Sequence, residues 1–197
     1  MFDATLTLLE GAGYAPLTIS AVARRAGATK PAIHRRWQTR RQLVLAALAQ
    51  RLSEVHVPDT GCTLCDLSEG IKVFLEALDR MPPNVLGPLL ADCAHDADLR
   101  AAFMTSLFDP PRAAVAQMLD QARARGDLRS DIDRDLILDL LGSLVHYRAL
   151  FGHAPNSESD IARAVEVLLR GIAVDYPRLI EHSRNLAGDA QIHPLHA

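Results

Sequence analysis

The sequence predicts an all-α protein, and its composition is the main reason. Of its 197 residues, 49% are hydrophobic but only 5% are aromatic, and leucine and alanine dominate the apolar set. Both residue types are strong helix formers, whereas the β-branched and aromatic runs that mark strands are scarce. A chain of this length can bury one sizeable core and carry a small additional module.

The first helices of the chain are expected to be short, with recognisable start and stop signals. Phe2, Leu6 and Leu9 recur at the spacing of one helical face, and the glycine-rich segment 11–13 ends this helix. Thr18 stands where the N-cap of a second helix belongs, because its hydroxyl can accept a free backbone N–H of the next turn. The second and third helices are expected over residues 19–25 and 30–37.

The third helix begins at another cap, Thr29, and has Pro31 in its first turn, where the missing N–H of proline costs little. A turn of small residues over 26–28 separates it from the second helix. Ile33 and Trp37 point inward, so the basic residues of this helix point outward. Two short helices joined by a tight turn, the second of them basic, are typical of a helix-turn-helix whose second helix enters the major groove of DNA.

Charge is distributed unevenly between the start of the chain and the rest. Residues 1–54 carry eight Lys and Arg against three Asp and Glu, a net charge of +5, and the remainder carries 13 against 21, a net charge of −8. No acidic residue occurs between Arg24 and Arg51. The charge alone also fits a solvated surface, but together with the capped helices it predicts a polyanionic partner for the first part of the chain.

A fourth, amphipathic helix is expected over 40–55 and would connect the N-terminal module with the rest of the chain. A loop follows over 56–63, and clusters of Pro, Gly and Asp then divide the remaining sequence. The strongest of these breaks is Asp109-Pro110-Pro111. The further helical segments are expected over 64–80, 85–94, 98–108, 112–125, 133–152 and 157–174.

The last two segments, 133–152 and 157–174, are apolar around most of their circumference, so each must be covered on more than one side. A second subunit would supply this cover by forming an intermolecular four-helix bundle with two-fold symmetry. A central position in the core of the monomer is the alternative. Residues 183–197 are small, polar and unpatterned, and we expect them to form a disordered tail.

The cysteines leave open a role in redox chemistry or metal binding. Cys62 and Cys65 have CxxC spacing with His56 nearby, but zinc requires four nitrogen or sulfur ligands. The third cysteine, Cys93, is followed by His95 without a second CxxC. We therefore expect no metal site and no cofactor, and a thiol- or metal-responsive sensor remains an alternative function.

Sequence signals for catalysis and for membrane insertion are missing. There is no HExxH, no glycine-rich phosphate loop and no GxSxG, so we expect no catalytic residues and no enzyme. No apolar run approaches the roughly 18 residues that span a bilayer. The start of the chain lacks the basic residues of a signal peptide, and the odd cysteine count fits a reducing compartment. These observations predict a cytoplasmic protein with no membrane partner.

A series of positions in the first quarter of the chain forms a pattern without a gap, running from Phe2 through Gly13-Tyr14, Thr18-Ile19, 22–30 and 33–37 into 39–44. In this pattern the chain resembles the DNA-binding domain of the TetR/AcrR family. The resemblance implies an all-α homodimer with an N-terminal three-helix, helix-turn-helix domain and a C-terminal helical-bundle domain for ligand binding and dimerisation. The DNA-binding domain, the effector-binding and dimerisation domain, and the tail are expected over 1–46, 47–182 and 183–197.

By this resemblance, the third helix presents the residues that read DNA, where Arg and Lys can pair with guanine acceptors or phosphates. Thr18 and Arg40 match positions that usually touch phosphates. The family usually has a tyrosine where this chain has His34, which can still donate a hydrogen bond. The expected DNA-binding residues are Thr18, Thr29, Lys30, Pro31, Ala32, His34, Arg35, Arg36 and Arg40.

The middle helices supply apolar side chains with a few polar groups among them, which is the composition of a small-molecule pocket. For each of these side chains, a place in the core or in a dimer interface is the alternative. Effector binding would favour a state whose recognition helices no longer match the groove spacing, a step that only the resemblance supports. The expected effector-binding residues are Phe74, Leu78, Met81, Leu90, Phe103, Met118, His146, Tyr147 and Phe151.

These features predict a transcriptional repressor that binds double-stranded DNA as a homodimer and is released by an unidentified small-molecule effector. Two recognition helices about one DNA turn apart, ~34–36 Å, would bind a pseudo-palindromic operator. One alternative is a thiol- or metal-responsive DNA-binding sensor that uses Cys62 and Cys65. Another is a non-enzymatic helical scaffold whose basic face binds some other polyanion. The sequence leaves open activation in place of repression.

Overall fold

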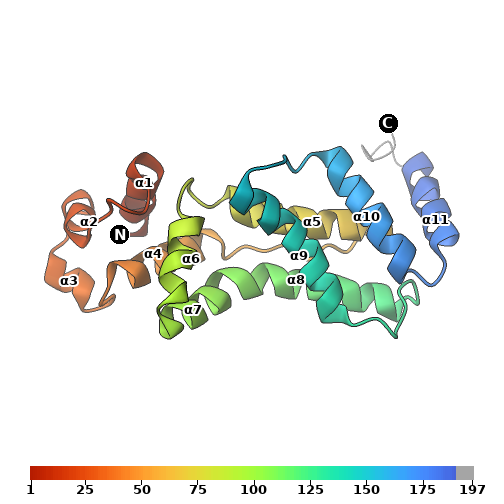
Figure 1. Ribbon diagram of the computed structural model, residues 1–197, viewed down its shortest axis with the longest axis horizontal. Coiled ribbons are helices and arrows are strands. Elements are labelled where there is room, and N and C mark those ends of the chain that lie inside the picture. The colour runs from red at the N-terminus through yellow and green to blue at the C-terminus, as the bar shows by residue number, and fades with distance from the viewer. Residues whose placement is uncertain (190–197) are drawn as a thin grey trace. The chain divides into compact units, whose positions relative to one another are not determined.

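The computed structural model describes residues 1–189, with side-chain surroundings up to Leu186. The described chain consists of α-helices and one π-helical turn, with no strand (Figure 1). The predicted all-α fold class is confirmed. The elements are α1 (Phe2–Ala12), α2 (Ile19–Arg25), α3 (Lys30–His34), α4 (Arg40–Arg51), α5 (Thr63–Asp79), α6 (Leu86–Ala94), α7 (Ala97–Phe103), the π-helical turn η1 (Met104–Phe108), α8 (Asp109–Ala124), α9 (Arg134–Phe151), α10 (Glu158–Ile172) and α11 (Tyr176–Asp189).

The chain forms two compact units. The N-terminal unit contains Met1–Val55 and Glu76–Pro110, and the C-terminal unit contains His56–Leu75 and the chain from Pro111 onward. Helices α1 to α4, α6 and α7 therefore belong to the N-terminal unit, whereas α9, α10 and α11 belong to the C-terminal unit. Helix α5 contributes residues to both, and most of α8 lies in the C-terminal unit.

The short helices of the N-terminal unit begin at the threonine caps that the sequence predicts. Thr18 and Thr29 each accept a hydrogen bond from the backbone N–H three residues later, at 3.1 and 3.4 Å. A third cap, Thr39, forms a reciprocal capping box with Gln42 at the start of α4. Gly27 has a φ of 62°, in the left-handed region that favours glycine, and allows the tight turn between α2 and α3. Local chemistry thus determines where these helices start.

The core of the N-terminal unit joins the three-helix module to later helices. Leu9, Ile33 and Leu48 are fully buried in one apolar cluster with Val85 and Leu89, which lie at the start of α6. Helix α1 packs along α4, and α4 also contacts α7 and η1. Burial of each such side chain stabilises the fold by roughly 1.5–3 kcal/mol. Helix α3 is therefore supported by a core to which α6 contributes.

The C-terminal unit buries a second apolar core between α5, α8, α9 and α10. Its fully buried side chains include Leu67 of α5, Met118 of α8, Ile137 of α9 and Leu169 of α10. Met118 of α8 lies against Gly70 of α5, and Phe74 of α5 lies against Gly142 of α9, so α5 packs against both α8 and α9. In the described part of the chain, no helix combines the length and the apolarity needed to cross a membrane.

The break expected at Asp109-Pro110-Pro111 is wrong. After α7 the chain continues through η1, and α8 begins at Asp109 itself, so both prolines lie in the first turn of α8. First-turn N–H groups have no acceptor within their own helix, and a proline there loses little. The wider π-helical turn separates α7 from α8, so the prolines stand at a helix start and not in a helix interior.

The disordered tail expected from residue 183 is also wrong for its first part. Helix α11 extends to Asp189, and it buries Leu179 and Ser183 against the C-terminal unit. The apolar positions of this helix are few, which is why no periodic pattern marked it in the sequence. The remainder of the expected tail, 190–197, lies outside the described residues.

Candidate nucleic-acid interface

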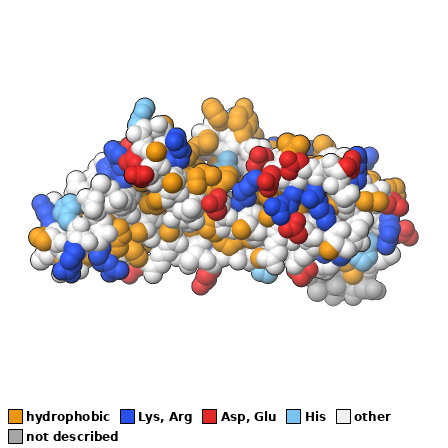
Figure 2. Space-filling model, turned by 90° about the horizontal axis from the view of Figure 1, so that it is seen from below, with side chains coloured by type: hydrophobic (Ala, Val, Ile, Leu, Met, Phe, Trp, Pro, Cys, Tyr) orange, Lys and Arg blue, Asp and Glu red, His pale blue; other side chains and the backbone are white. Residues whose placement is uncertain are grey.

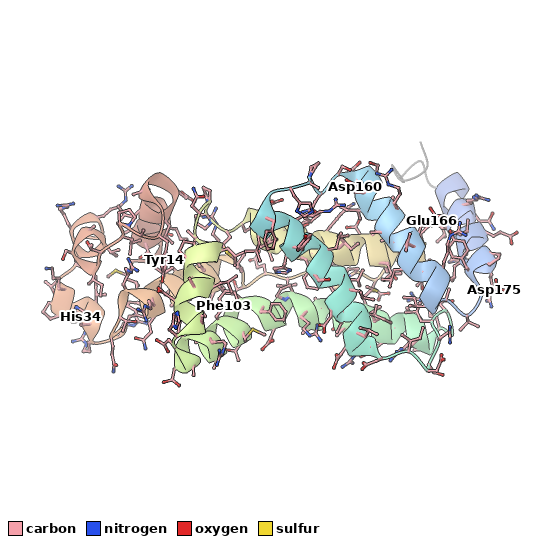
Figure 3. All side chains as sticks on the ribbon, in the orientation of Figure 1. Tyr14, His34, Phe103, Asp160, Glu166 and Asp175 are labelled. Atoms are coloured by element: carbon pink, nitrogen blue, oxygen red, sulfur yellow. The ribbon has the colours of Figure 1, made fainter. Side chains whose placement is uncertain are left out.

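Helix α3 has a buried side and an exposed side, and most of the predicted DNA-binding residues lie on the exposed side. The buried side is anchored by Ile33, which is fully buried. His34, one position later, lies on the outer surface of α3 (Figure 3). Helical spacing accounts for this division, since residues one apart point about 100° away from each other. The predicted residues exposed on or beside α3 are Thr29, Lys30, Pro31, His34, Arg35 and Arg36, with Ala32 half-buried.

The cations of this surface are largely unpaired. Among the described residues, no carboxylate lies within ion-pair distance of Lys30 or Arg35, and no acidic residue occurs between Arg24 and Arg51. Figure 2 shows several Lys and Arg side chains at its left, over the part of the N-terminal unit that contains α2 and α3. Unpaired surface cations keep their charge available for DNA phosphates and guanine edges. This surface can therefore bind a polyanion without first breaking internal ion pairs.

Arg36 is positioned by an aromatic contact at the end of α3. Its guanidinium carbon lies 5.0 Å from the centroid of the Trp37 ring. Trp37 in turn meets the ring of Phe2 edge-on, with 5.3 Å between the centroids. An exposed cation–π contact contributes roughly 0.5–1 kcal/mol. This contact positions the guanidinium of Arg36, and the residue stays exposed.

Arg40, a predicted phosphate ligand, makes hydrogen bonds within the protein. Its Nη1 donates to the carbonyl oxygens of Tyr14, Ala15 and Leu17, at 3.3, 2.9 and 3.3 Å. Its guanidinium also lies over the Tyr14 ring, 4.6 Å from the centroid. Arg40 thus stabilises the turn before α2. Its contact with DNA, like that of the exposed Thr18, stays a prediction.

Tyr14 belongs to a polar network that the sequence analysis missed. Its hydroxyl donates to Asp92 Oδ2 of α6 at 2.6 Å. Arg41 of α4 pairs with Asp92 at 3.2 Å and with Asp96 at 3.4 Å. Burial, followed by the hydrogen bond to Asp92, raises the pKa of Tyr14 above its ordinary value. The network connects α4 and α6 within the N-terminal unit, and no local signal could reveal it because Tyr14 and Asp92 lie 78 positions apart.

We expect Tyr14→Phe to lower the free energy of unfolding by roughly 1–2 kcal/mol at neutral pH, because Asp92 loses a buried donor. The raised pKa means that the folded state favours the neutral phenol. The stabilisation from this preference is complete below the ordinary tyrosine pKa of 10.0 and decreases as pH rises above it. Urea unfolding near neutral pH and again near pH ~11 should therefore show a smaller difference between the two proteins at alkaline pH. An equal difference at both pH values would contradict this role of Tyr14.

Comparison with known families decides which proteins this chain is related to. The model described as bacterial regulatory proteins, tetR family, matches residues 2–47. The model described as tetracyclin repressor-like, C-terminal domain, matches residues 57–168, which is more than half of the chain. The chain belongs to the TetR family. As a TetR-family protein it is a DNA-binding transcriptional regulator of the repressor type and not an enzyme.

Individual TetR-family proteins resemble the chain over most of its length. The DNA-binding transcriptional repressor TetR of Mycobacteroides abscessus is 30% identical over 159 residues, which cover 80% of this chain and 83% of that protein. The HTH-type transcriptional regulator AqdR of Rhodococcus erythropolis is 30% identical over 74% of this chain and 70% of its own. A TetR-family transcription regulator of known structure is also 30% identical, with a TM-score of 0.69 over 86% of this chain and 94% of that chain. A TetR transcriptional regulator from Agrobacterium tumefaciens, 23% identical over 87% of this chain and 92% of that chain, shares the fold with a TM-score of 0.69.

The predicted effector-binding residues of this TetR-family chain fall into both units. In the C-terminal unit, Phe74 and Met118 are buried, and the ring of His146 lies 6.2 Å from that of Phe74. Tyr147 and Phe151 are exposed, and their rings lie 5.0 Å apart. The role of all nine residues in ligand binding stays a prediction. The members in the N-terminal unit are Leu78, Met81, Leu90 and Phe103, of which Phe103 is buried and the others are half-buried.

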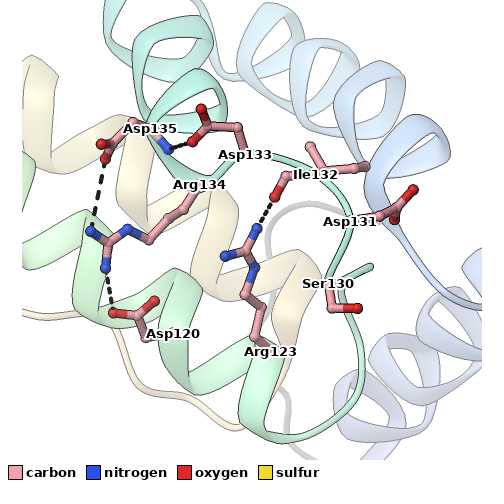
Figure 4. Close-up of a pocket in the computed structure, with 8 residues that line it drawn as sticks. All are labelled: Asp120, Arg123, Ser130, Asp131, Ile132, Asp133, Arg134 and Asp135. Atoms are coloured by element: carbon pink, nitrogen blue, oxygen red, sulfur yellow. Dashed lines mark hydrogen bonds and ion pairs between the residues drawn. The ribbon is translucent and has the colours of Figure 1, made fainter.

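Two surface hollows of the C-terminal unit are lined by residues other than the predicted effector-binding ones. A hollow of about 490 Å³ lies between α8 and α9, lined by Asp120, Arg123 and the segment 130–135 (Figure 4). Arg134 pairs there with Asp120 at 2.8 Å, and Arg123 donates to the carbonyl oxygen of Ile132. A smaller hollow of about 230 Å³ lies between α5, α10 and α11. Neither is lined by any of the nine predicted effector-binding residues.

Proposed function

We propose that this TetR-family protein is a homodimeric repressor that binds a pseudo-palindromic operator through α3 and leaves it when a small-molecule effector binds. The observation that carries the DNA-binding part is the exposed, unpaired basic surface of α3. The helix is capped by Thr29 and anchored by Ile33, so its exposed side chains are positioned before they enter the major groove of DNA. In this proposal residues 1–46 bind the operator in the cytoplasm, and residues 47–182 dimerise and bind the effector.

An exposed apolar face on α9 and α10 supports the homodimer. Large apolar side chains on this face are 46–73% exposed, which leaves a substantial hydrophobic area in water. On α9 they recur four and seven positions apart and so share one side of the helix. Two copies of such a face can cover each other across a two-fold axis as a four-helix bundle. The residues are Leu136, Leu140, Tyr147, Leu150 and Phe151 from α9, Val167 from α10 and Val174 after it.

We expect Leu140→Asp to weaken dimerisation by at least about 100-fold, because the dimer would bury two unpaired carboxylates at this face. Analytical ultracentrifugation of the full chain measures the change as a shift from dimer to monomer. Ala101→Asp is the matched control, since it adds the same charge at an exposed apolar position of α7 in the N-terminal unit. Dimers of unchanged affinity in Leu140→Asp would exclude this face as the interface.

A two-fold dimer would also determine the form of the operator. Each protomer presents one α3, and two recognition helices about 34 Å apart reach successive turns of the major groove on one side of the duplex. The two half-sites would then be inverted copies of each other. A pseudo-palindrome is therefore the expected target.

Release by an effector requires that ligand binding changes the position of α3. The Tyr14–Asp92–Arg41 network supports such a step, because it joins α4 to α6 and gives Arg41 two acidic partners, Asp92 and Asp96. A ligand that favours another position of α6 would shift α4 and, through their common core, α3. To move the ratio of the released to the DNA-binding conformation from about 1:99 to 99:1, the effector must bind the released conformation ~10⁴-fold more tightly.

Binding of the full chain to DNA flanking its own gene tests the proposed function. Fluorescence anisotropy with a labelled duplex should give a Kd of roughly 10⁻⁸–10⁻¹¹ M, at least about 1,000-fold tighter than with a scrambled duplex. The affinity should fall steeply as salt rises, because phosphate contacts release counterions. Equal affinity for both duplexes would overturn the repressor and favour a polyanion-binding scaffold.

A further inference from the structure

Cys62 and Cys65 lie together at the start of α5, and the proposed regulator makes no use of them. Cys62 occupies the position directly before the helix, and its Sγ accepts a hydrogen bond from the backbone N–H of Cys65 at 3.4 Å. Both side chains are buried, with 1% and 3% of their surface exposed. Residues three apart in the first turn of a helix place their side chains on the same side. The two sulfur atoms are therefore neighbours.

The surroundings make the two thiols chemically unequal. A hydrogen bond from the Cys65 thiol lowers the pKa of Cys62, and the backbone N–H of Cys65 adds to this effect. The same hydrogen bond, together with burial, raises the pKa of Cys65. Burial and, more weakly, the nearby carboxylate of Asp66 oppose ionisation of Cys62, and Asp66 is itself paired with Arg125 at 3.1 Å. Of the two thiols, Cys62 is therefore the more easily ionised.

Helix α11 covers this pair of cysteines. Ser183 Oγ lies 3.8 Å from Cys65 Sγ, and His182 Nε2 lies 3.4 Å from the carbonyl oxygen of Gly61, next to Cys62. Both contacts come from a single helix close to the end of the described chain. Local opening of α11 would remove the contact between Ser183 and Cys65 and make this pair more accessible to a small reagent.

We propose that Cys62 and Cys65 form a dithiol site that hydrogen peroxide oxidises to an intramolecular disulfide. First, the Cys62 thiolate attacks the peroxide: an S–O bond forms, the O–O bond breaks, and the hydroxide that leaves takes a proton to become water. Then Cys65, deprotonated as it attacks, displaces the sulfenic oxygen from Cys62: the S–S bond forms, the S–O bond breaks, and the oxygen leaves as water. Two thiols and one hydrogen peroxide give one disulfide and two waters.

Oxidation accounts for this pair better than metal binding does. Zinc in structural sites takes four nitrogen or sulfur ligands, and the pair provides two. Within residues 1–189, no group of three or more His, Cys, Asp or Glu side chains is placed to hold a metal ion. A dithiol, in contrast, is complete for the disulfide reaction with these two sulfurs alone.

Treatment of the full chain with hydrogen peroxide, followed by denaturation and alkylation with iodoacetamide, tests the proposal. All three cysteines are free. Mass spectrometry should therefore find three carbamidomethyl groups before oxidation and one, on Cys93, after it. Reduction by dithiothreitol before alkylation should restore all three. Cys93 is the internal control, because burial raises the pKa of its thiol and no other cysteine lies near it in the sequence.

Serine variants of the two cysteines show which thiol acts in which step. Serine at position 62 keeps a good capping residue directly before α5. In Cys65→Ser, peroxide should leave a sulfenic acid on Cys62 that dimedone traps. In Cys62→Ser, Cys65 should stay reduced and alkylatable. Three alkylatable cysteines in the peroxide-treated wild type, or a sulfinic acid in place of the disulfide, would overturn the proposal. No DNA is involved in these measurements, so their outcome is independent of the proposed operator binding.

Discussion

Replacing Lys30 and Arg35 together by alanine is expected to weaken operator binding by roughly 2–6 kcal/mol, about 30-fold to more than 10,000-fold in Kd. Both side chains are exposed on α3, and neither has an acidic partner among the described residues. An arginine that pairs with guanine contributes roughly 1–3 kcal/mol of discrimination, and a lysine at a phosphate adds affinity for any sequence. The double variant should therefore lose both specificity and general affinity.

Anisotropy titrations at several salt concentrations distinguish these two contributions. For each phosphate contact that is lost, the slope of log K against log salt should become shallower by about 1. A lost base contact should instead reduce the preference for the operator over a scrambled duplex. The buried anchor Ile33 is unchanged in the variant, so its helical content and thermal stability should match those of the wild type.

Arg178→Ala provides the matched control for this experiment. It removes one positive charge from an exposed position of α11 in the C-terminal unit, where we propose no contact with DNA. Its affinity should stay within about two-fold of the wild type at moderate salt. If Arg178→Ala weakens binding as much as Lys30→Ala, or if the double variant binds normally, α3 is not the helix that recognises the operator.

Asp66→Ala is expected to have the largest effect on stability, lowering the free energy of unfolding by roughly 3–5 kcal/mol. Asp66 is fully buried, pairs with Arg125 at 3.1 Å and accepts two hydrogen bonds from Thr60, from its backbone N–H and from its hydroxyl, both at 2.7 Å. Alanine would leave the backbone N–H of Thr60 without this acceptor and would remove one of the two carboxylates, Asp66 and Asp127, that pair with the partly buried guanidinium of Arg125. Urea unfolding of the full chain measures the loss.

Two further variants show whether the charge and its burial matter. Asp66→Asn keeps one oxygen acceptor and the side-chain volume, so it should recover part of the stability that Asp66→Ala loses. Asp98→Ala removes an exposed carboxylate from the first turn of α7 and should cost no more than about 1 kcal/mol. A similar loss in Asp66→Ala and Asp98→Ala would refute the structural role of the buried network.

The helix-turn-helix could be predicted from the sequence because its determinants act locally. Thr18 and Thr29 cap α2 and α3 through backbone groups three residues away, and Gly27 supplies the turn between them. The apolar position of Ile33 likewise predicts which side of α3 faces inward and which side is free for DNA. Interactions that span three or four positions can be recognised in the sequence because few other arrangements satisfy the same residues.

Other features depended on contacts that no short stretch of sequence encodes. Tyr14 finds its acceptor 78 positions away in Asp92, and Asp66 pairs with Arg125 59 positions away. Arg40 donates to carbonyl oxygens of the turn before α2, contacts that the family resemblance, which implies a phosphate ligand at this position, did not indicate. Which polar groups meet depends on how the apolar faces of the helices pack, and that packing is a property of the folded chain. The sequence by itself therefore determined the capped, basic helix α3, whereas the tertiary structure decided which distant polar groups pair, Tyr14 with Asp92 in the N-terminal unit and the buried Asp66 with Arg125 beside the cysteine pair.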